Sequence, residues 1–143
     1  MRGHRAADTM GGMPSSLVEV RRSYTVAEEV ALIDAVHDSL VAAFRIPEED
    51  KHVRLLAYEP HRFTTSPDKA HPDRATRVTI DCFSGRSREA KRNLYREIVE
   101  RFELLGIPRD HVTILVRESD LENWGISGGQ AACDVDLGFT VTV

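Results

Sequence analysis

The dipeptide Met13-Pro14 is the part of the sequence best suited to supply an unusual base. If translation starts at Met13 and that methionine is removed, Pro14 becomes the first residue and carries a free secondary amine. An α-amino group has an unperturbed pKa of about 7.7–8.0, and an apolar pocket near other cations lowers this value. Such an amine acts as a general base near neutral pH. The structural alternative is that Pro14 only begins an edge strand, where its missing N–H does little harm.

Arg86 is the second residue whose position suggests chemistry. It lies in Ser84-Gly85-Arg86-Ser87, a segment typical of a tight turn from a strand into a helix, with Ser87 as the N-cap. A cation at this place opposes the helix dipole, and a guanidinium is the best two-point partner for a carboxylate. These properties favour a group that binds an acidic substrate over an arginine that is merely solvated at a helix start.

The clearest helix signal lies between these two residues. Thr25-Val26-Ala27-Glu28 forms a capping box, in which the Thr hydroxyl and the Glu carboxylate bind N–H groups at the helix end. Apolar residues then recur at spacings of three and four, which predicts one buried stripe. The stripe is Val26, Val30, Ile33, His37, Leu40 and Phe44. We expect this helix to run to about Arg45, with Pro47 ending it.

A second helix is predicted over 88–105, because Leu94, Ile98, Phe102 and Leu105 share one face and Gly106 follows as the C′ residue. Alternating or wholly apolar runs predict strands around the two helices. These strands are expected over 16–21, 52–58, 77–83 and 111–117, with a further short strand over 131–137. Residues 59–76 contain three prolines and little periodicity, which predicts a long loop.

The two halves of the chain resemble each other. Ile46-Pro47 and Ile107-Pro108 lie 61 positions apart, and each pair precedes a histidine and an apolar strand. Each half reads strand, helix, strand, which implies parallel pairing within the unit and a right-handed crossover. We therefore predict an α/β fold (α+β in some schemes) in which two β-α-β repeats form a four-stranded sheet with both helices on one face. Because the strands are apolar, we expect other subunits to cover the opposite face.

Composition limits the classes of partner. The chain has 143 residues, 41% hydrophobic content and a formal net charge of −4, with no basic block that would bind nucleic acid. No apolar run is long enough to span a membrane. We expect one domain over 14–143, after a leader over 1–13 that is disordered or removed. Cys82 and Cys133 are expected to be reduced core thiols of a cytoplasmic protein, and the six histidines lack metal-site spacing.

Several short motifs in this order and spacing are fairly specific together. They are Met13-Pro14, Asp34-Ala35-Val36-His37, Phe44 with Ile46-Pro47-Glu48-Glu49-Asp50, Phe83-Ser84-Gly85-Arg86-Ser87 with Lys91 and Leu94-Tyr95, and Glu122-Asn123-Trp124 with Gly128-Gly129. Over 13–139 the chain resembles the 4-oxalocrotonate tautomerase-like (tautomerase) superfamily, in the branch that contains malonate semialdehyde decarboxylase and cis-3-chloroacrylic acid dehalogenase. The resemblance implies a trimeric tautomerase/MIF-like fold that uses no cofactor.

The resemblance also implies roles for four residues. Pro14 matches the catalytic amino-terminal proline, and Arg86 matches the arginine that holds the substrate carboxylate and stabilises developing negative charge. Asp50 stands where the decarboxylase has an aspartate that handles water, and His37 where the dehalogenase has a histidine that assists carboxylate binding. Gly85 replaces the first of two arginines in the decarboxylase turn. From the sequence, His52, Arg54 and Tyr58 are expected to face the same cavity.

These observations lead to one functional hypothesis and two alternatives. The hypothesis is a homotrimeric, cofactor-independent tautomerase that acts on a small 2-oxo/enol or unsaturated carboxylic acid, with Pro14 as general base and acid. The first alternative is decarboxylation or hydration of a 3-oxo or unsaturated acid at the same site. The second is a non-catalytic trimeric binding module, which applies if the leader before Pro14 is retained.

Overall fold

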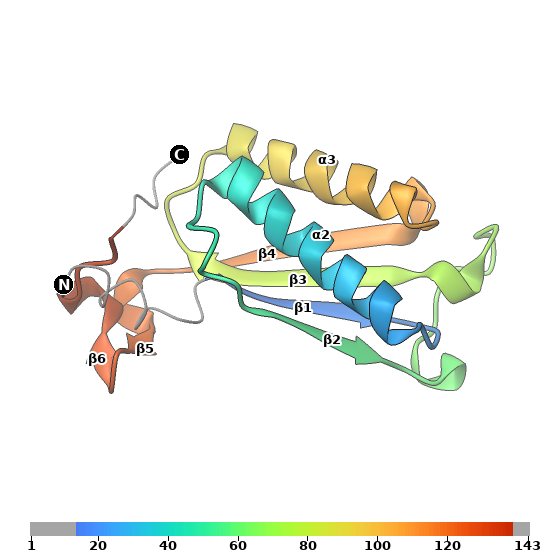
Figure 1. The fold of residues 1–143 in the computed structure, drawn as a ribbon, viewed down its shortest axis with the longest axis horizontal. Coiled ribbons are helices and arrows are strands. Elements are labelled where there is room, and N and C mark those ends of the chain that lie inside the picture. The colour runs from blue at the N-terminus through green and yellow to red at the C-terminus, as the bar shows by residue number, and fades with distance from the viewer. Residues whose placement is uncertain (1–13, 139–143) are drawn as a thin grey trace.

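Two helices lie across one face of a four-stranded sheet (Figure 1). The computed structural model describes residues 14–138. The main elements are β1 (Ser15–Val20), α2 (Val26–Phe44), β2 (Val53–Ala57), β3 (Thr76–Phe83), α3 (Arg88–Leu104) and β4 (Val112–Ser119). Short 3₁₀ turns occur in the connections, and a small hairpin of β5 (Gly125–Ile126) and β6 (Gln130–Ala131) follows β4. The predicted order of strands and helices is confirmed.

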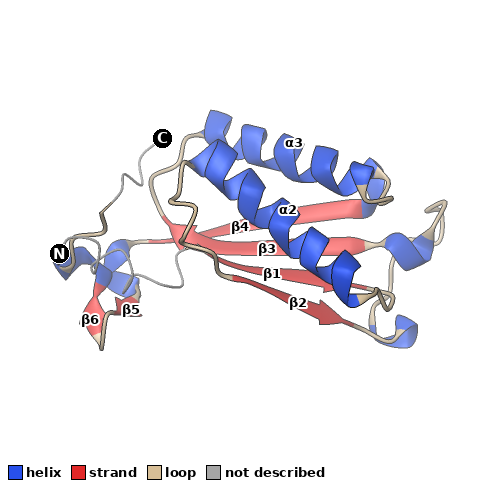
Figure 2. Cartoon of the chain, viewed as in Figure 1, coloured by secondary structure: helices blue, strands red, loops and turns tan. Residues whose placement is uncertain are grey.

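The sheet consists of two β-α-β units joined at its centre. Its strand order is β2-β1-β3-β4, in which β1 pairs with β2 and β3 with β4 in parallel, whereas β1 and β3 are antiparallel. Figure 2 shows that both helices cover the same face. Because β1 and β3 begin 61 positions apart, Ala75-Thr76 takes the place in the second unit that Pro14-Ser15 has in the first. The predicted repeat is therefore present in space.

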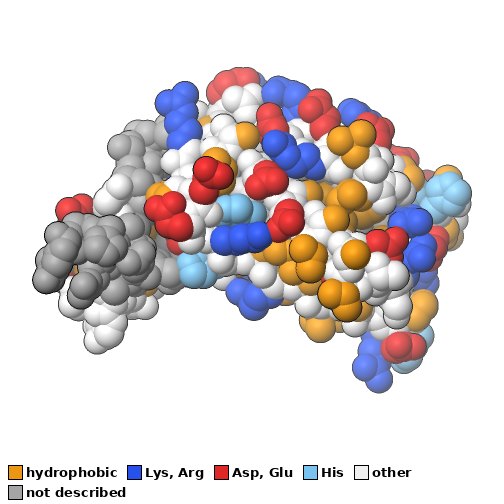
Figure 3. Space-filling view, in the orientation of Figure 1, with side chains coloured by type: hydrophobic (Ala, Val, Ile, Leu, Met, Phe, Trp, Pro, Cys, Tyr) orange, Lys and Arg blue, Asp and Glu red, His pale blue; other side chains and the backbone are white. Residues whose placement is uncertain are grey.

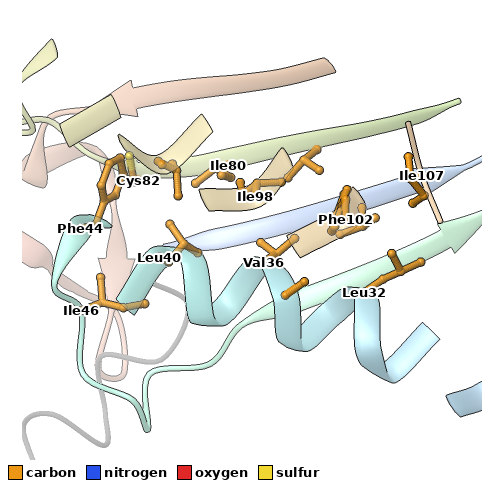
Figure 4. Close-up of a cluster of buried hydrophobic side chains, with 14 of the residues drawn as sticks. Leu32, Val36, Leu40, Phe44, Ile46, Ile80, Cys82, Ile98, Phe102 and Ile107 are labelled. Atoms are coloured by element: carbon orange, nitrogen blue, oxygen red, sulfur yellow. The ribbon is translucent and has the colours of Figure 1, made fainter. Parts of the chain in front are cut away.

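The capping box of α2 is confirmed, but its buried stripe differs from the prediction. Thr25 Oγ1 accepts a hydrogen bond from the Glu28 N–H at 3.1 Å, and Glu28 Oε1 accepts one from the Thr25 N–H at 2.8 Å. Leu32, Val36, Leu40 and Phe44 point into the core (Figure 4). Val26 is 77% exposed, and Val30 is also exposed. The residues in this line are four apart, and the predicted stripe is buried only from His37 onward, at His37, Leu40 and Phe44.

Helix α3, like α2, has the predicted cap at its start and a buried line of residues four apart. Ser87 Oγ accepts a hydrogen bond from the Ala90 N–H at 3.0 Å, which confirms the predicted N-cap. The buried residues of α3 are Ala90, Leu94, Ile98 and Phe102, again four apart. Leu105 was expected on this face, but it is the C-cap residue and is exposed, because the helix ends before it. Gly106 has a φ of +93° and reverses the chain there.

The core fills the space between the helices and the sheet. Every second residue of the central strands faces the helices and is fully buried, namely Val18, Val20, Val78, Ile80 and Cys82. A smaller cluster packs Ile126 and Ala132 against Phe83 at the end of β3, where Trp124 contacts the Phe83 ring edge-on at 5.5 Å. This cluster fixes the segment after β4 to the end of the sheet at which β3 stops.

Two expectations for the last part of the chain are wrong. The strand expected over 131–137 is only the two-residue β6, because Ala132–Asp134 turns into a 3₁₀ helix and makes no ladder. Cys133 is exposed in that turn and is not a core thiol, whereas Cys82 is buried as expected. Of the described residues, no helix is long and apolar enough to cross a membrane.

The face of the sheet that the helices leave free is mixed in character. Leu56 and Leu115 are exposed on it, and Leu17 and Leu115 lie on either side of Thr79 in the strand register. Arg117 also lies there and makes two hydrogen bonds to the Asp81 carboxylate, at 2.8 and 2.9 Å. The expected apolar character of this face therefore holds only in part, because leucines alternate with charged pairs across it.

Candidate active site

Pro14 lies at the end of the sheet where β1 and β2 begin and β3 stops. It is buried directly before β1. The next alternate residue, Ser16, donates its N–H to the His52 carbonyl at 3.0 Å and lies opposite Ile80 of β3. Continuing the β1–β3 register by one step from Ser15 and Asp81 places Pro14 opposite Cys82. The strand ladders therefore bring Pro14 close to the turns before β2 and after β3.

Arg86 is a buried cation with free hydrogen-bond donors. Its side chain is 6% exposed, Nη1 donates to the Phe83 carbonyl at 3.1 Å, and the guanidinium lies 4.9 Å from the centre of the Phe44 ring. Among residues 14–138, its Nε and Nη2 have no hydrogen-bond partner. Burial lowers the pKa of the guanidinium, and the nearby Cys82 and Glu118 partly oppose this. Two neighbouring nitrogens with free N–H groups on one planar cation suit a carboxylate.

Asp50 is a buried carboxyl group in the turn before β2. Neither of its oxygens has a hydrogen-bond partner in the described part of the chain. Burial raises the pKa of Asp50 to about 7, and the neighbouring Glu49 charge adds to the rise. Oδ1 lies 3.0 Å from His52 Nε2, yet the contact lacks hydrogen-bond geometry. Asp50 therefore gains and loses a proton near neutral pH.

The two histidines beside Asp50 differ in their surroundings. His37 is buried on α2, and its Nε2 lies 2.7 Å from the Glu48 carbonyl, which can only accept, so Nε2 carries the proton. Its Nδ1 is buried without a partner among residues 14–138. The His52 side chain is 35% exposed, and burial of the rest, followed by the effect of His37, lowers its pKa. The lowered His52 pKa and raised Asp50 pKa favour a neutral histidine beside a protonated carboxyl over an ion pair.

The predicted site residues thus fall into two neighbouring groups. His37 and Asp50 belong to one group with His52, and Pro14 and Arg86 are linked through Cys82 and the end of β3. Figure 4 shows Phe44 and Cys82 at the same end of the core. The sequence did not assign a site role to Phe44 or Cys82. Two features of the sequence could have pointed to them: Phe44 is the last residue of the apolar stripe, and Cys82 lies four residues before Arg86.

Two of the three accessory predictions are wrong. Tyr58 follows the far end of β2, where its N–H donates to the Val20 carbonyl at 2.9 Å and its hydroxyl bonds to Glu19. Arg54 is exposed, and its Nη1 donates to Ser15 Oγ at 2.8 Å, because residue 54 points to the sheet face without helices. Only His52 joins the candidate site.

Two pockets lie away from these residues. One, of about 280 Å³, is lined by Tyr24, by residues of early α2 that include Glu28, and by Leu104 and Leu105 at the end of α3. Figure 3 shows hydrophobic side chains gathered on this part of the molecule. The other, of about 220 Å³, lies near the start of β3 and β4 and includes Ala75 and His111, so both pockets lie at the end of the sheet away from Pro14. In residues 14–138, no group of three or more His, Cys, Asp or Glu side chains is placed to hold a metal ion.

Comparisons with known proteins agree with this arrangement. The chain is 25% identical over 123 residues to the Probable tautomerase YusQ of Bacillus subtilis (strain 168), covering 83% of this chain and 97% of that protein. FG41 malonate semialdehyde decarboxylase inhibited by 3-bromopropiolate has a similar fold, with a TM-score of 0.73, 24% identity and coverage of 82% and 92% of the two chains. Native fused 4-OT does as well, with a TM-score of 0.75, 21% identity and coverage of 85% and 98%.

The match to a family model identifies the chain more directly. A model described as "Tautomerase enzyme" matches residues 50–127, which is more than half of the sequence. The matched range includes Asp50 and Arg86, whereas Pro14 and His37 precede it. The protein therefore belongs to the family of tautomerase enzymes.

Proposed function

We propose that this chain, with Pro14 as its first residue, is a cofactor-independent tautomerase that acts on a small 2-oxo/enol or unsaturated carboxylic acid. The observation that carries the proposal is the buried Arg86, whose Nε and Nη2 have no partner among the described residues. A desolvated guanidinium with two free donors is costly for the protein alone, and a substrate carboxylate offsets that cost. Pro14 lies at the same end of the sheet.

The reaction requires one proton to move between two atoms of the substrate. The neutral Pro14 amine takes the proton from the enol hydroxyl, and the electrons form the carbonyl at C2 while the C2–C3 double bond breaks. The resulting ammonium returns the proton to C3, so the amine is regenerated and the product is the 2-oxo acid. Arg86 holds the carboxylate and stabilises negative charge that develops on the neighbouring oxygen.

Asp50 supports decarboxylation or hydration as the second candidate function. Burial raises its pKa to about 7, so the group exchanges a proton near neutral pH. It precedes β2, which pairs with β1 directly after Pro14. A carboxyl with these properties can hold or activate water beside a bound 3-oxo or unsaturated acid. The similar fold of FG41 malonate semialdehyde decarboxylase is consistent with this candidate.

The proposed assembly is a homotrimer. The leucines exposed on the helix-free face of the sheet support burial against other copies, and solved structures with a similar fold include fused 4-OT trimers. We expect three times the chain mass by light scattering at micromolar concentration. A single-chain mass at that concentration would contradict the proposal.

The amino terminus provides the decisive experiment. Intact mass of the natively expressed protein should correspond to a chain that begins at Pro14. That chain should convert the enol of phenylpyruvate to the keto form, measured by loss of enol absorbance, while a chain that retains residues 1–13 should do so poorly. The nitrogen of Pro14 is a titratable amine only if Pro14 is the first residue, because within a chain it belongs to an amide. Equal rates for the two chains would show that Pro14 is not the base and would favour the non-catalytic binding module.

A further inference from the structure

His52 is the only route to solvent that the described contacts give to the buried Asp50. The Asp50 side chain is 3% exposed and makes no hydrogen bond with residues 14–138, whereas His52, 3.0 Å away, is 35% exposed. The backbone of His52 is fixed, because its carbonyl accepts the Ser16 N–H at 3.0 Å. One edge of the imidazole therefore contacts the carboxyl while another part of the ring meets water.

The other described groups around the pair offer Asp50 no second path to solvent. Glu49 lies on the same turn and repels a charged Asp50. Lys51, next along the chain, is paired with Asp34 of α2. His37, also on α2, keeps its Nε2 proton on the Glu48 carbonyl and disfavours a charged His52. None of these groups connects Asp50 to solvent through a described contact.

We propose that His52 is a positioning residue that carries protons between Asp50 and the solvent. This inference rests on the proposed function, in its decarboxylation or hydration form. The Asp50 O–H bond breaks as an N–H bond forms at His52 Nε2, and a proton leaves Nδ1 to a water or buffer base. A rotation of the exposed ring about its Cβ–Cγ bond aligns Nε2 with Oδ1, which lies within reach but outside hydrogen-bond geometry.

Such a relay matters for the second candidate reaction more than for the first. In enol-to-keto conversion the proton taken by Pro14 returns to the same substrate molecule. In decarboxylation of a 3-oxo acid, the C–CO₂ bond breaks and the product takes up one proton from outside. In hydration, Asp50 takes a proton from water as the hydroxide adds to C3, and the Pro14 ammonium gives a proton to C2. Asp50 must then release its proton before the next turnover. His52 supplies the exchange in both cases: protons move from solvent to Asp50 in decarboxylation, by the reverse of the step above, and from Asp50 to solvent in hydration.

A titration of the His52 ring tests the coupling without any substrate. Ring resonances of His52 should show a step near pH 7 as Asp50 ionises, followed by a second step at lower pH as the imidazole itself gains a proton. In Asp50→Asn the step near pH 7 should vanish and the lower step should stay. An unchanged single-step curve in both proteins would overturn the proposal.

Chemical rescue tests the transfer itself. In the chain that begins at Pro14, decarboxylation of 3-oxopropanoate by His52→Ala should be roughly 10- to 100-fold slower at low buffer concentration. Added imidazole should restore much of the rate. His61→Ala is the matched control, because His61 is an exposed histidine in the 3₁₀ helix Pro60–Arg62 and should show neither effect.

The outcomes separate this inference from the proposed function. A rate loss in His52→Ala that imidazole does not restore would indicate a structural role and overturn the relay. If the parent chain consumed neither 3-oxopropanoate nor the enol, the proposed function would fail, and the two-step His52 titration would still decide the coupling. His52→Gln, which keeps most of the side-chain volume, should reproduce the rate loss if His52→Ala fails to fold.

Discussion

An aspartate–histidine pair stands at each end of the sheet, and the two pairs have opposite burial. At the Pro14 end, the carboxyl of Asp50 is 3% exposed and the His52 ring 35%. At the other end, the Asp110 carboxylate is 72% exposed and the His111 ring 1%, with Oδ1 2.8 Å from Nδ1. Burial raises the pKa of Asp50, whereas the hydrogen bond from His111 lowers the pKa of Asp110. The pKa values of the two aspartates thus shift in opposite directions, because the carboxyl is the buried partner in one pair and the exposed partner in the other.

The second pair also has its hydrogen bonds complete. His111 Nε2 accepts the His71 N–H at 3.0 Å while Nδ1 contacts Asp110, so the ring joins the long loop to the start of β4. The arginines show the same contrast. Arg109 donates from Nε and Nη2 to Glu103 at 3.1 and 2.8 Å, and those two atoms of Arg86 have no described partner. Unpaired buried groups collect at one end of the sheet, where a ligand can complete them.

The largest expected effect separates the two arginines. Arg86→Ala should lower kcat/KM for the phenylpyruvate enol by an amount that corresponds to about 2–5 kcal/mol of lost transition-state stabilisation. The reason is that a desolvated carboxylate loses its charged partner. Arg109→Ala should stay within about threefold of the parent, since a surface ion pair contributes little. Steady-state kinetics of both variants provide the measurement.

Two further variants control for the buried position of Arg86. Arg86→Met keeps most of the side-chain volume over the Phe44 ring, so a loss equal to that of Arg86→Ala would assign the effect to charge. Arg86→Lys should restore activity only in part, because an ammonium cannot make the planar two-point contact. If Arg86→Ala kept kcat/KM within threefold on every acid tested, the site around Pro14 and Arg86 would be wrong.

A middle-sized effect is expected on folding at the other end. His111→Ala should lower the free energy of unfolding by about 1–3 kcal/mol, because it removes a buried ring and leaves the His71 N–H without its acceptor. His52→Ala should cost less, since its ring is partly exposed and makes no hydrogen bond to Asp50. Urea denaturation compares the two. A larger loss of unfolding free energy in His52→Ala than in His111→Ala would contradict the view that His111 has the structural role and His52 the functional one.

The pH dependence of stability should have opposite signs for the two aspartates. The folded pKa of Asp50, about 7, lies above the ordinary 3.8, so the folded protein binds the extra proton. Its contribution is present below about pH 4 and is lost as the pH rises toward 7. The pKa of Asp110 is lowered, so its contribution is present above the ordinary value and is lost as the pH falls through the lowered value.

Two amide variants test these signs. Asp50→Asn should remove the loss of stability between about pH 4 and pH 7, and Asp110→Asn should remove a loss on the acid side. Asp38→Asn, at an exposed position of α2, serves as the control. Unfolding free energies measured across this range give the slopes. Parallel slopes for the Asp50 and Asp110 variants would contradict the opposite pKa shifts of the two aspartates.

The sequence predicts the elements well because the signals for them are local. The capping box at Thr25, the N-cap at Ser87 and the glycine after α3 each act within one turn, and each is found as expected. The alternation of Val78, Ile80 and Cys82 likewise fixes which face of β3 is buried. The 61-residue repeat then gives the topology, since each unit needs a parallel crossover.

The sequence predicts the site less well because burial there depends on distant segments. Val26 is apolar and in phase with His37, yet it is exposed because α2 crosses the sheet along the line from Leu32 to Phe44. Tyr58 is six residues from His52, but a strand carries it to the opposite end of the sheet. The free donors of Arg86 and the buried carboxyl of Asp50 depend on packing that no short motif encodes.

The 61-residue repeat also limits what a duplicated fold can do. Ala75 has the position before β3 that Pro14 has before β1, but Ala75 is joined to Arg74 by a peptide bond. One polypeptide has a single amino terminus, so an amine base can serve only one of two equivalent strand ends. The peptide bond before Ala75 therefore makes the two halves inequivalent. The end of the sheet that carries Ala75 and His111 can serve to hold the long loop in place.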